Sequence, residues 1–188
     1  AIYEFTWHEF CDWYLELSKP VLQSDETSDA QKRGTRRTLI DVLETILRMM
    51  HPLMPFITEE IWAQVAPRAG IKGETLMHRP FPEPDNELKD ADAEAELDWV
   101  MRFILGIRQI RGEMDISPGK TLPVLLEGAD GDDLRFADAN RLILARVGRV
   151  ESVTALQGDE DAPPSATALV GSMRLLVPMA GLIDVEAE

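Results

Sequence analysis

Four basic side chains lie within six residues of one another in the segment QKRGTRR, residues 31–37. They are Lys32, Arg33, Arg36 and Arg37. A guanidinium group presents a planar fork of N–H donors that matches phosphate oxygens, and it also stacks on nucleobases. The run lies near the start of a predicted helix, where the helix dipole favours acidic groups. A phosphate-rich partner would explain this placement, and a solvated charged turn without function is the alternative.

The rest of the chain is strongly acidic. Its 188 residues include 34 acidic and 19 basic side chains, which gives a net charge of −15. Such a balance argues against broad nonspecific binding of nucleic acid, because counterion release requires Lys and Arg at the contact surface. Acidic residues gather in 83–98, 130–138 and 159–161. The sequence therefore predicts an acidic body with a local basic site.

We find no pattern typical of a catalytic or metal site. His8 and Cys11 lie three residues apart, but metal sites normally bring four ligands together, so packing in a helix is the favoured interpretation. His51 and His78 have no recognisable nucleophile beside them, and no glycine-rich phosphate loop is present. We therefore predict no catalytic residue, no metal and no cofactor in this chain.

Apolar residues at helical spacing predict the first helices. One stripe consists of Tyr3, Trp7, Phe10, Tyr14 and Leu17. Core packing is favoured over base stacking as the function of these aromatic side chains. Pro20 is expected to end the helix. The next stripe consists of Leu39, Leu43, Ile46 and Met50, in a helix capped by Ser28 or Asp29.

Two prolines interrupt the apolar run MHPLMPFITEEIW, residues 50–62. Pro52 lacks an N–H and biases His51 away from helical geometry, so it ends the second helix. Pro55 suits the first turn of a new helix, where its missing N–H would have no partner anyway. Two helices that meet through one tight, buried corner are therefore expected.

A fourth helix is expected over about residues 91–114. Its apolar stripe consists of Leu97, Val100, Ile104 and Ile107. Steps of about 100° per residue place Arg111 within that stripe and Arg108 at its border. Arg111 needs a partner there, which is either a carboxylate of Glu44, Glu59 or Glu60, or an RNA group.

The hydrophobic period then changes from helix to strand. Strands are expected at 122–126 and 150–156, a helix from Asp132 or Asp133 to Val147, and a hairpin over 167–178 that turns at Gly171 and Ser172. We therefore predict a mainly α chain: a bundle of about four helices over 1–115, followed over 116–188 by a small α+β module with a short, mostly antiparallel sheet.

Several of these segments together resemble the anticodon-binding region of bacterial valyl-tRNA synthetases, which are class I enzymes. They are FTWHEFCDWYLELSKP, RGTRRTL, HPLMPFITEEIW, RPFPEPD, IRQIRGEMDISPGK and LVPMAGLIDVEAE. The HPLMPFITEEIW motif is shared with isoleucyl and leucyl enzymes, whereas FCDWYLEL, ISPGK and PMAGLID favour valine. Asp115 stands where the family more often has Asn.

The resemblance implies that the chain holds the anticodon stem-loop of tRNA(Val) for a catalytic domain upstream. That domain carries the ATP-binding HIGH-type and KMSKS-type motifs, and neither occurs here, so ATP would serve the parent ligase and this chain alone would be non-catalytic. The RNA contacts expected from charge and position are Lys32, Arg33, Arg36, Arg37, Arg108, Arg111 and Lys120.

Location and assembly follow as further expectations. Both ends look like cuts through a longer protein that continues into a coiled-coil arm. One cysteine fits a reducing compartment, and no apolar run approaches the length of a membrane span, so a cytoplasmic monomer without membrane contact is expected. The alternatives are the corresponding domain of an isoleucyl or leucyl enzyme, or a helical scaffold domain whose basic run docks on an acidic protein surface.

Overall fold

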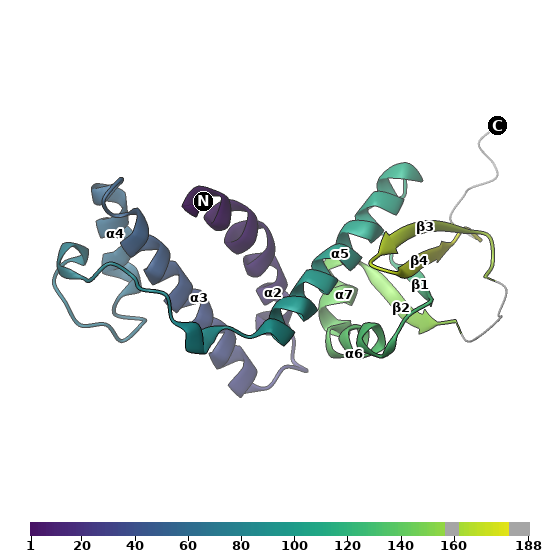
Figure 1. Cartoon of the computed structure of the whole chain (residues 1–188), viewed down its shortest axis with the longest axis horizontal. Helices are drawn as coiled ribbons and strands as arrows, with labels where there is room; N and C mark the ends of the chain where they lie inside the picture. Colours follow the sequence, from purple (N-terminus) through teal and green to yellow (C-terminus); the bar gives the residue numbers. More distant parts are fainter. Residues whose placement is uncertain (157–161, 181–188) are drawn as a thin grey trace. The chain divides into compact units, whose positions relative to one another are not determined.

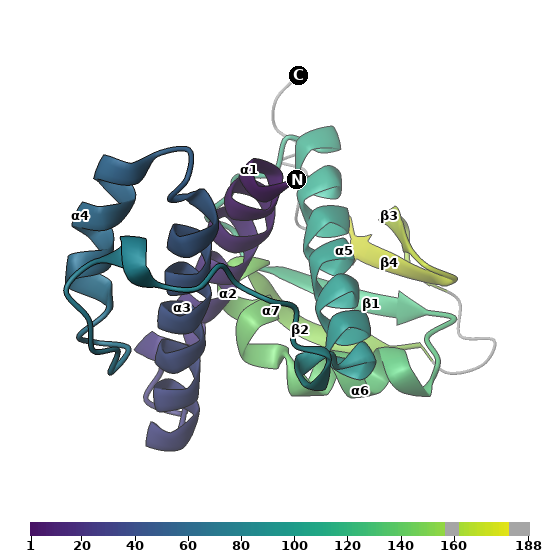
Figure 2. The same cartoon turned by 60° about the vertical axis from the view of Figure 1, so that its left-hand side comes forward.

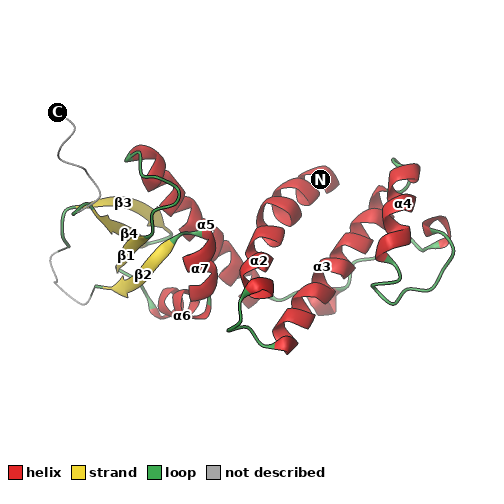
Figure 3. Cartoon of the chain, turned by 180° about the vertical axis from the view of Figure 1, so that it is seen from behind, coloured by secondary structure: helices red, strands yellow, loops and turns green. Residues whose placement is uncertain are grey.

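The computed structural model describes residues 1–156 and 162–180 (Figure 1). The chain divides into two compact units, Ala1–Lys89 and Asp90–Glu188, which we describe separately. The first unit is helical, and the second contains the strands (Figure 3). None of the described helices is long and apolar enough to cross a membrane. The end of the chain, where a coiled-coil arm is expected to begin, lies outside the described residues.

The first unit contains four α-helices, one π-helical segment and two short 3-10 turns. They are α1 (Ile2–Glu4), η1 (Phe5–Tyr14), α2 (Leu15–Gln23), α3 (Asp29–Met50), α4 (Pro55–Val65), η2 (Leu76–His78) and η3 (Asn86–Leu88). The first three elements follow one another without a break, and α3 and α4 lie side by side (Figure 2).

The predicted aromatic core stripe is only partly correct. Phe10 and Leu17 are buried, but Tyr3 is 67% exposed and Trp7 is 54% exposed. Trp7 lies in η1, whose winding is π-helical, and the Leu15 N–H donates to the Phe10 carbonyl, five residues back. This wider turn displaces side chains spaced by three and four residues from a single line.

The predicted end of the first helix at Pro20 is wrong, because α2 continues to Gln23. Proline has a helical φ, so within a helix it costs one N–H donor and a close contact of its ring with the carbonyl four residues back. Only one turn follows Pro20, and its carbonyl still accepts a hydrogen bond from the Ser24 N–H at 3.0 Å. The lost hydrogen bond is the one to the Glu16 carbonyl, four residues before Pro20, and the helix tolerates this single loss.

The predicted boundaries around α3 and α4 are confirmed. Ser28 caps α3 through a reciprocal pair: its Oγ accepts from the Gln31 N–H at 3.3 Å, and its own N–H donates to Gln31 Oε1 at 3.0 Å. Helix α3 ends at Met50, and α4 begins at Pro55. The expectation that Pro52 moves His51 out of helical geometry is wrong, because His51 keeps a φ of −55° and a ψ of −40° and its N–H still donates to the Leu47 carbonyl at 2.9 Å. The two helices form a core around Trp62, which is 2% exposed.

The prediction of a buried corner between α3 and α4 is wrong. Leu53 is 74% exposed and Phe56 is 91% exposed. The face of α4 that packs inward carries Thr58 and Trp62, and Phe56 lies about 200° from Thr58 around the helix. A polar pair occupies the inner side of the corner instead, because His51 Nδ1 and Thr58 Oγ1 are 2.8 Å apart.

The second unit places helices against a four-stranded sheet. Its elements are α5 (Ala91–Glu113), β1 (Leu122–Glu127), α6 (Gly131–Ala139), α7 (Arg141–Val147), β2 (Val150–Ala155), β3 (Ser165–Val170) and β4 (Met173–Pro178). The strand order is β2-β1-β4-β3. Strands β1 and β2 are parallel and the other two pairings are antiparallel, so the predicted mainly α chain with a small, mostly antiparallel sheet is confirmed.

Two details of this unit differ from the predictions. The helix expected up to Val147 is divided at Asn140 into α6 and α7, and the cap of α6 is Asp130, whose Oδ1 accepts from the N–H groups of Asp132 and Asp133 at 2.9 Å. The hairpin turns at Gly171 and Ser172 as predicted, and the φ of +61° at Gly171 suits glycine.

Helix α5 packs against the sheet of the second unit. Val100, Phe103, Ile104 and Ile107 on α5 are fully buried, and an added Cβ at Gly106 would lie 3.0 Å from Leu175 Cδ1. The boundary between the two compact units accordingly lies between residues 89 and 90, so α5 is part of the second unit. The sequence had grouped this helix with the bundle predicted over 1–115. An apolar helical stripe does not specify which partner covers it.

The two glycines near the end of α5 predict opposite effects of substitution. Gly106→Val adds a β-carbon and two methyl groups against Leu175 and Ala168, and we expect it to lower the free energy of unfolding by about 2 kcal/mol. Gly112→Ala is the matched control, because nothing lies within 4 Å of its Cβ position. It should raise stability by about 0.5–1 kcal/mol through helix propensity. If thermal unfolding shows that the melting temperatures of both variants shift in the same direction, the packing of Gly106 against Leu175 is contradicted.

Candidate nucleic-acid interface

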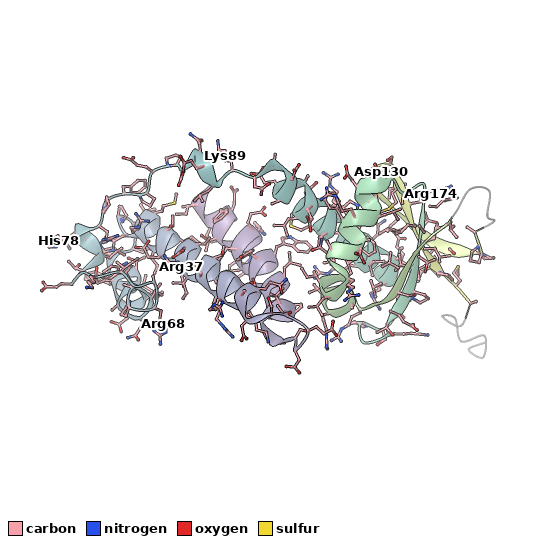
Figure 4. All side chains as sticks on the ribbon, turned by 90° about the horizontal axis from the view of Figure 1, so that it is seen from below. Arg37, Arg68, His78, Lys89, Asp130 and Arg174 are labelled. Atoms are coloured by element: carbon pink, nitrogen blue, oxygen red, sulfur yellow. The ribbon has the colours of Figure 1, made fainter. Side chains whose placement is uncertain are left out.

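Arginine side chains from two segments of the first unit line a groove of about 460 Å³. The lining residues are Arg33, Arg36, Arg37, Leu39, Ile40 and Arg68. Figure 4 labels Arg37 on α3 and Arg68 in the turn that follows α4. Three arginines of the predicted basic run therefore meet in one groove, together with a fourth arginine that the sequence analysis did not select.

The helical repeat of α3 explains why three of these arginines share a surface. Arg33, Arg36, Arg37 and Ile40 are spaced at i, i+3, i+4 and i+7, which places them on one helix face. Lys32 does not line the groove, so the structure does not bring it together with the other members of the run. It is half-buried on α3.

Arg37 joins α3 to the turn that carries Arg68. Its Nε donates to Asp41 Oδ2 at 2.6 Å, and its Nη1 donates to the carbonyl of Ala69 at 3.1 Å. The Arg68 N–H donates to the Val65 carbonyl at 3.0 Å, and its guanidinium donates to the Gln64 carbonyl, so this turn continues directly from α4. Arg37 therefore positions the groove, and its own charge is partly neutralised by Asp41.

Arg33 and Arg36 are the more available donors. Both are exposed, and neither forms an ion pair with any residue that the structure describes. Their side chains stand beside Leu39 and Ile40, which give the groove an apolar floor. Guanidinium donors around an apolar surface suit a nucleotide, because a base offers an apolar face and its phosphate offers acceptor oxygens.

Arg111 has a structural environment that differs from the predicted one. Its guanidinium donates to the carbonyls of Ser117 at 3.0 Å, Lys120 at 2.8 Å and Arg149 at 3.1 Å. Burial, and then the nearby charge of Arg149, lower the pKa of Arg111. Main-chain oxygens therefore hold this arginine within the second unit. The predicted pairing with a carboxylate of Glu44, Glu59 or Glu60 would join the two units, which are described separately, so it stays a prediction.

Those three glutamates lie in the first unit, and two of them have partners there. Glu44 accepts hydrogen bonds from Arg48 and Trp62. Both carboxylate oxygens of Glu59 lie 3.1 Å from the Leu76 N–H. These contacts stabilise the first unit.

The remaining predicted contacts, Arg108 and Lys120, are exposed residues of the second unit. Arg108 lies one turn before Arg111 on α5, and Lys120 lies in the loop before β1. Neither lines the groove of the first unit. The basic residues selected from the sequence therefore belong to two separate places in the chain.

Comparison with known protein families bears directly on this arrangement. A family model described as the anticodon-binding domain of tRNA ligase matches residues 1–126. The match includes all of the first unit with its arginine groove, helix α5 and most of β1. It covers about two thirds of the 188 residues, so this chain belongs to the family of tRNA ligase anticodon-binding domains.

Proposed function

We propose that this chain binds the anticodon stem-loop of tRNA(Val) and positions the tRNA for a valine–tRNA ligase. The observation that carries this proposal is the groove in which Arg33, Arg36 and Arg68 surround Leu39 and Ile40. Membership in the family supports tRNA as the partner. The groove supports the choice of the surface on this chain that binds the tRNA.

The chemistry of an anticodon loop matches such a groove. Loop nucleotides are single stranded, so proteins read them by stacking on aromatic or guanidinium planes and by bonding to base edges. Arg33 and Arg36 would bond phosphates or stack on bases, while Leu39 and Ile40 contact an apolar base face. Acidic groups over the rest of the chain would oppose RNA bound elsewhere and so favour this site.

Specificity for valine is supported by the segments FCDWYLEL, ISPGK and PMAGLID, which resemble valyl enzymes. In this proposal an upstream catalytic domain of the parent ligase binds ATP and performs the aminoacylation. The chain itself contributes RNA binding and orientation, as part of a monomeric cytoplasmic enzyme. An isoleucyl or leucyl parent is the nearest alternative, since it shares HPLMPFITEEIW.

A binding comparison tests the proposal. We expect the 188-residue chain to bind a tRNA(Val) transcript about tenfold or more tightly than the same transcript with altered anticodon bases, because mispaired polar groups in a binding site cost at least about 1.4 kcal/mol. Affinity should also fall as salt rises, since phosphate contacts release counterions. Fluorescence anisotropy at several salt concentrations measures both effects.

Each result that differs from this expectation supports a specific alternative. Preference for an isoleucine or leucine tRNA would assign the parent to that enzyme. Equal binding of both valine transcripts would contradict anticodon recognition. No binding at low salt would favour the scaffold function instead, and the exposed Leu53 and Phe56 at the corner between α3 and α4 provide that alternative with an apolar surface.

A further inference from the structure

Arg37 differs from the other arginines of the groove in how its guanidinium group is held. Its Nε donates to Asp41 Oδ2 at 2.6 Å, and its Nη1 donates to the Ala69 carbonyl at 3.1 Å. A guanidinium group is planar, so acceptors at two of its nitrogens fix the direction in which its remaining N–H groups point. The orientation of Arg37 is therefore set before any ligand binds.

Both acceptors are themselves held by the first unit. Asp41 follows Arg37 by one turn of α3, and Ala69 is only 5% exposed. The Ala69 N–H donates to the Val65 carbonyl at 3.0 Å, which ties its turn to the end of α4. The ion pair with Asp41 is exposed and contributes little to stability, so its main effect is on the direction of the Arg37 side chain.

The other groove arginines lack this double restraint. Arg33 and Arg36 form no ion pair with any residue that the structure describes, and the Arg68 guanidinium donates to the Gln64 carbonyl, four residues back. Side chains of this kind lose rotamer freedom when they bind a ligand, so they supply charge more readily than direction. Arg37 also lines the groove, and its Nη2 has no partner among the described residues, so this nitrogen is available to a ligand.

From this geometry we infer that Arg37 is a specificity-determining residue of the groove and that Asp41 is its positioning residue. The inference rests on the proposed function, because it takes the anticodon loop as the ligand of the groove. Bonds to base edges are directional and discriminate only when the donor is held in place, whereas phosphate contacts carry no sequence information. Arg37 therefore donates from Nη2 to an acceptor on a base edge, while Arg33 and Arg36 supply charge and stacking planes.

The test measures binding by the 188-residue chain with Asp41→Ala, both to the tRNA(Val) transcript and to the transcript with altered anticodon bases. Loss of a negative charge in the groove should raise the affinity for the altered transcript about two- to threefold. The native transcript should gain nothing, because Arg37 loses its orientation when the charge is removed. The preference for the native anticodon should therefore shrink by the same factor.

Three further variants separate orientation from charge. Asp41→Asn removes the same charge but keeps an oxygen that can accept from Arg37 Nε, so it should raise the affinity for both transcripts and retain most of the preference. Arg37→Lys keeps the positive charge without the planar fork, so it should bind the altered transcript well and lose preference. Glu60→Ala removes an exposed carboxylate of the same unit that does not line the groove, and it should leave the preference unchanged.

The ratio of the two affinities decides the outcome, and thermal unfolding confirms that each variant is folded. If Asp41→Ala changes the affinity for both transcripts by the same factor, Asp41 acts through charge or stability alone, so the inference is wrong and the proposed function stands. A preference that survives in Arg37→Lys contradicts the inference independently. If the unsubstituted chain does not distinguish the two transcripts, the proposed function and the inference are both overturned.

Discussion

Replacement of Arg33, Arg36 and Arg68 by glutamine in one chain is expected to weaken binding of tRNA(Val) about 100-fold. The three side chains converge in one groove, and loss of a charge-assisted contact of about 1 kcal/mol at each gives this factor. The slope of log affinity against log salt should decrease by about two to three, because up to three phosphate contacts disappear. Filter binding or anisotropy over a salt series measures both quantities.

A control with the same change in net charge separates a local effect from a general one. Arg102, Arg135 and Arg174 each pair with a carboxylate in the second unit. Their combined replacement by glutamine should weaken binding only a few-fold. If this control loses as much affinity as the groove variant, net charge governs the interaction and the groove has no special part in it.

Glu44→Ala is expected to lower the free energy of unfolding of the first unit by about 3–5 kcal/mol. The carboxylate is 3% exposed, and it accepts from Arg48 Nε at 2.9 Å and from Trp62 Nε1 at 3.2 Å. Its removal leaves a half-buried guanidinium and a buried indole N–H without their acceptor. Chemical denaturation followed by circular dichroism measures the loss.

Two other glutamate variants calibrate that effect. Glu44→Gln retains a carbonyl oxygen for the indole N–H but loses the ion pair, so its cost should be smaller. Glu16→Ala removes a surface carboxylate that pairs with Lys19 at 2.5 Å, and exposed pairs contribute about 0–1 kcal/mol. A Glu44→Ala variant that unfolds like Glu16→Ala would show that the buried network does not hold α3 against α4.

The predictions that succeeded depend on local chemistry. Ser28, Pro52 and Pro55 act through their own backbone or through residues within one turn, so the sequence alone specifies where α3 begins and ends and where α4 begins. Gly171 likewise determines the turn between β3 and β4. Such boundaries need no knowledge of distant segments.

The helix end predicted at Pro20 is a failure of local reasoning, whereas other predictions that failed depend on what lies opposite a residue in space. Phe56 and Trp7 are large and apolar, yet both are more than half exposed, because the direction of a side chain depends on the winding and packing of its helix. Arg111 fits an apolar stripe, but the partners that the structure shows are main-chain carbonyls, those of Lys120 nine residues later and of Arg149 in a more distant turn. Periodicity shows that such a residue needs a partner without showing which one.

Only part of the groove can be predicted from the sequence. Helical spacing is sufficient to place Arg33, Arg36 and Arg37 on one face of α3. Arg68 is a single basic residue in the segment APRAG, and nothing local marks it as a neighbour of that face. Only the packing of α4 on α3, together with the hydrogen bond from Arg37 to the Ala69 carbonyl, brings the two segments together.

A thermodynamic cycle tests most directly whether this groove reads the anticodon loop. Affinities are measured for the unsubstituted chain and for Arg36→Gln, each with tRNA(Val) and with the transcript whose anticodon bases are altered. Our account predicts that the preference for the native anticodon shrinks at least about threefold in Arg36→Gln, because interacting groups are non-additive. A preference that is unchanged by the substitution would contradict the account and place anticodon recognition elsewhere on the chain.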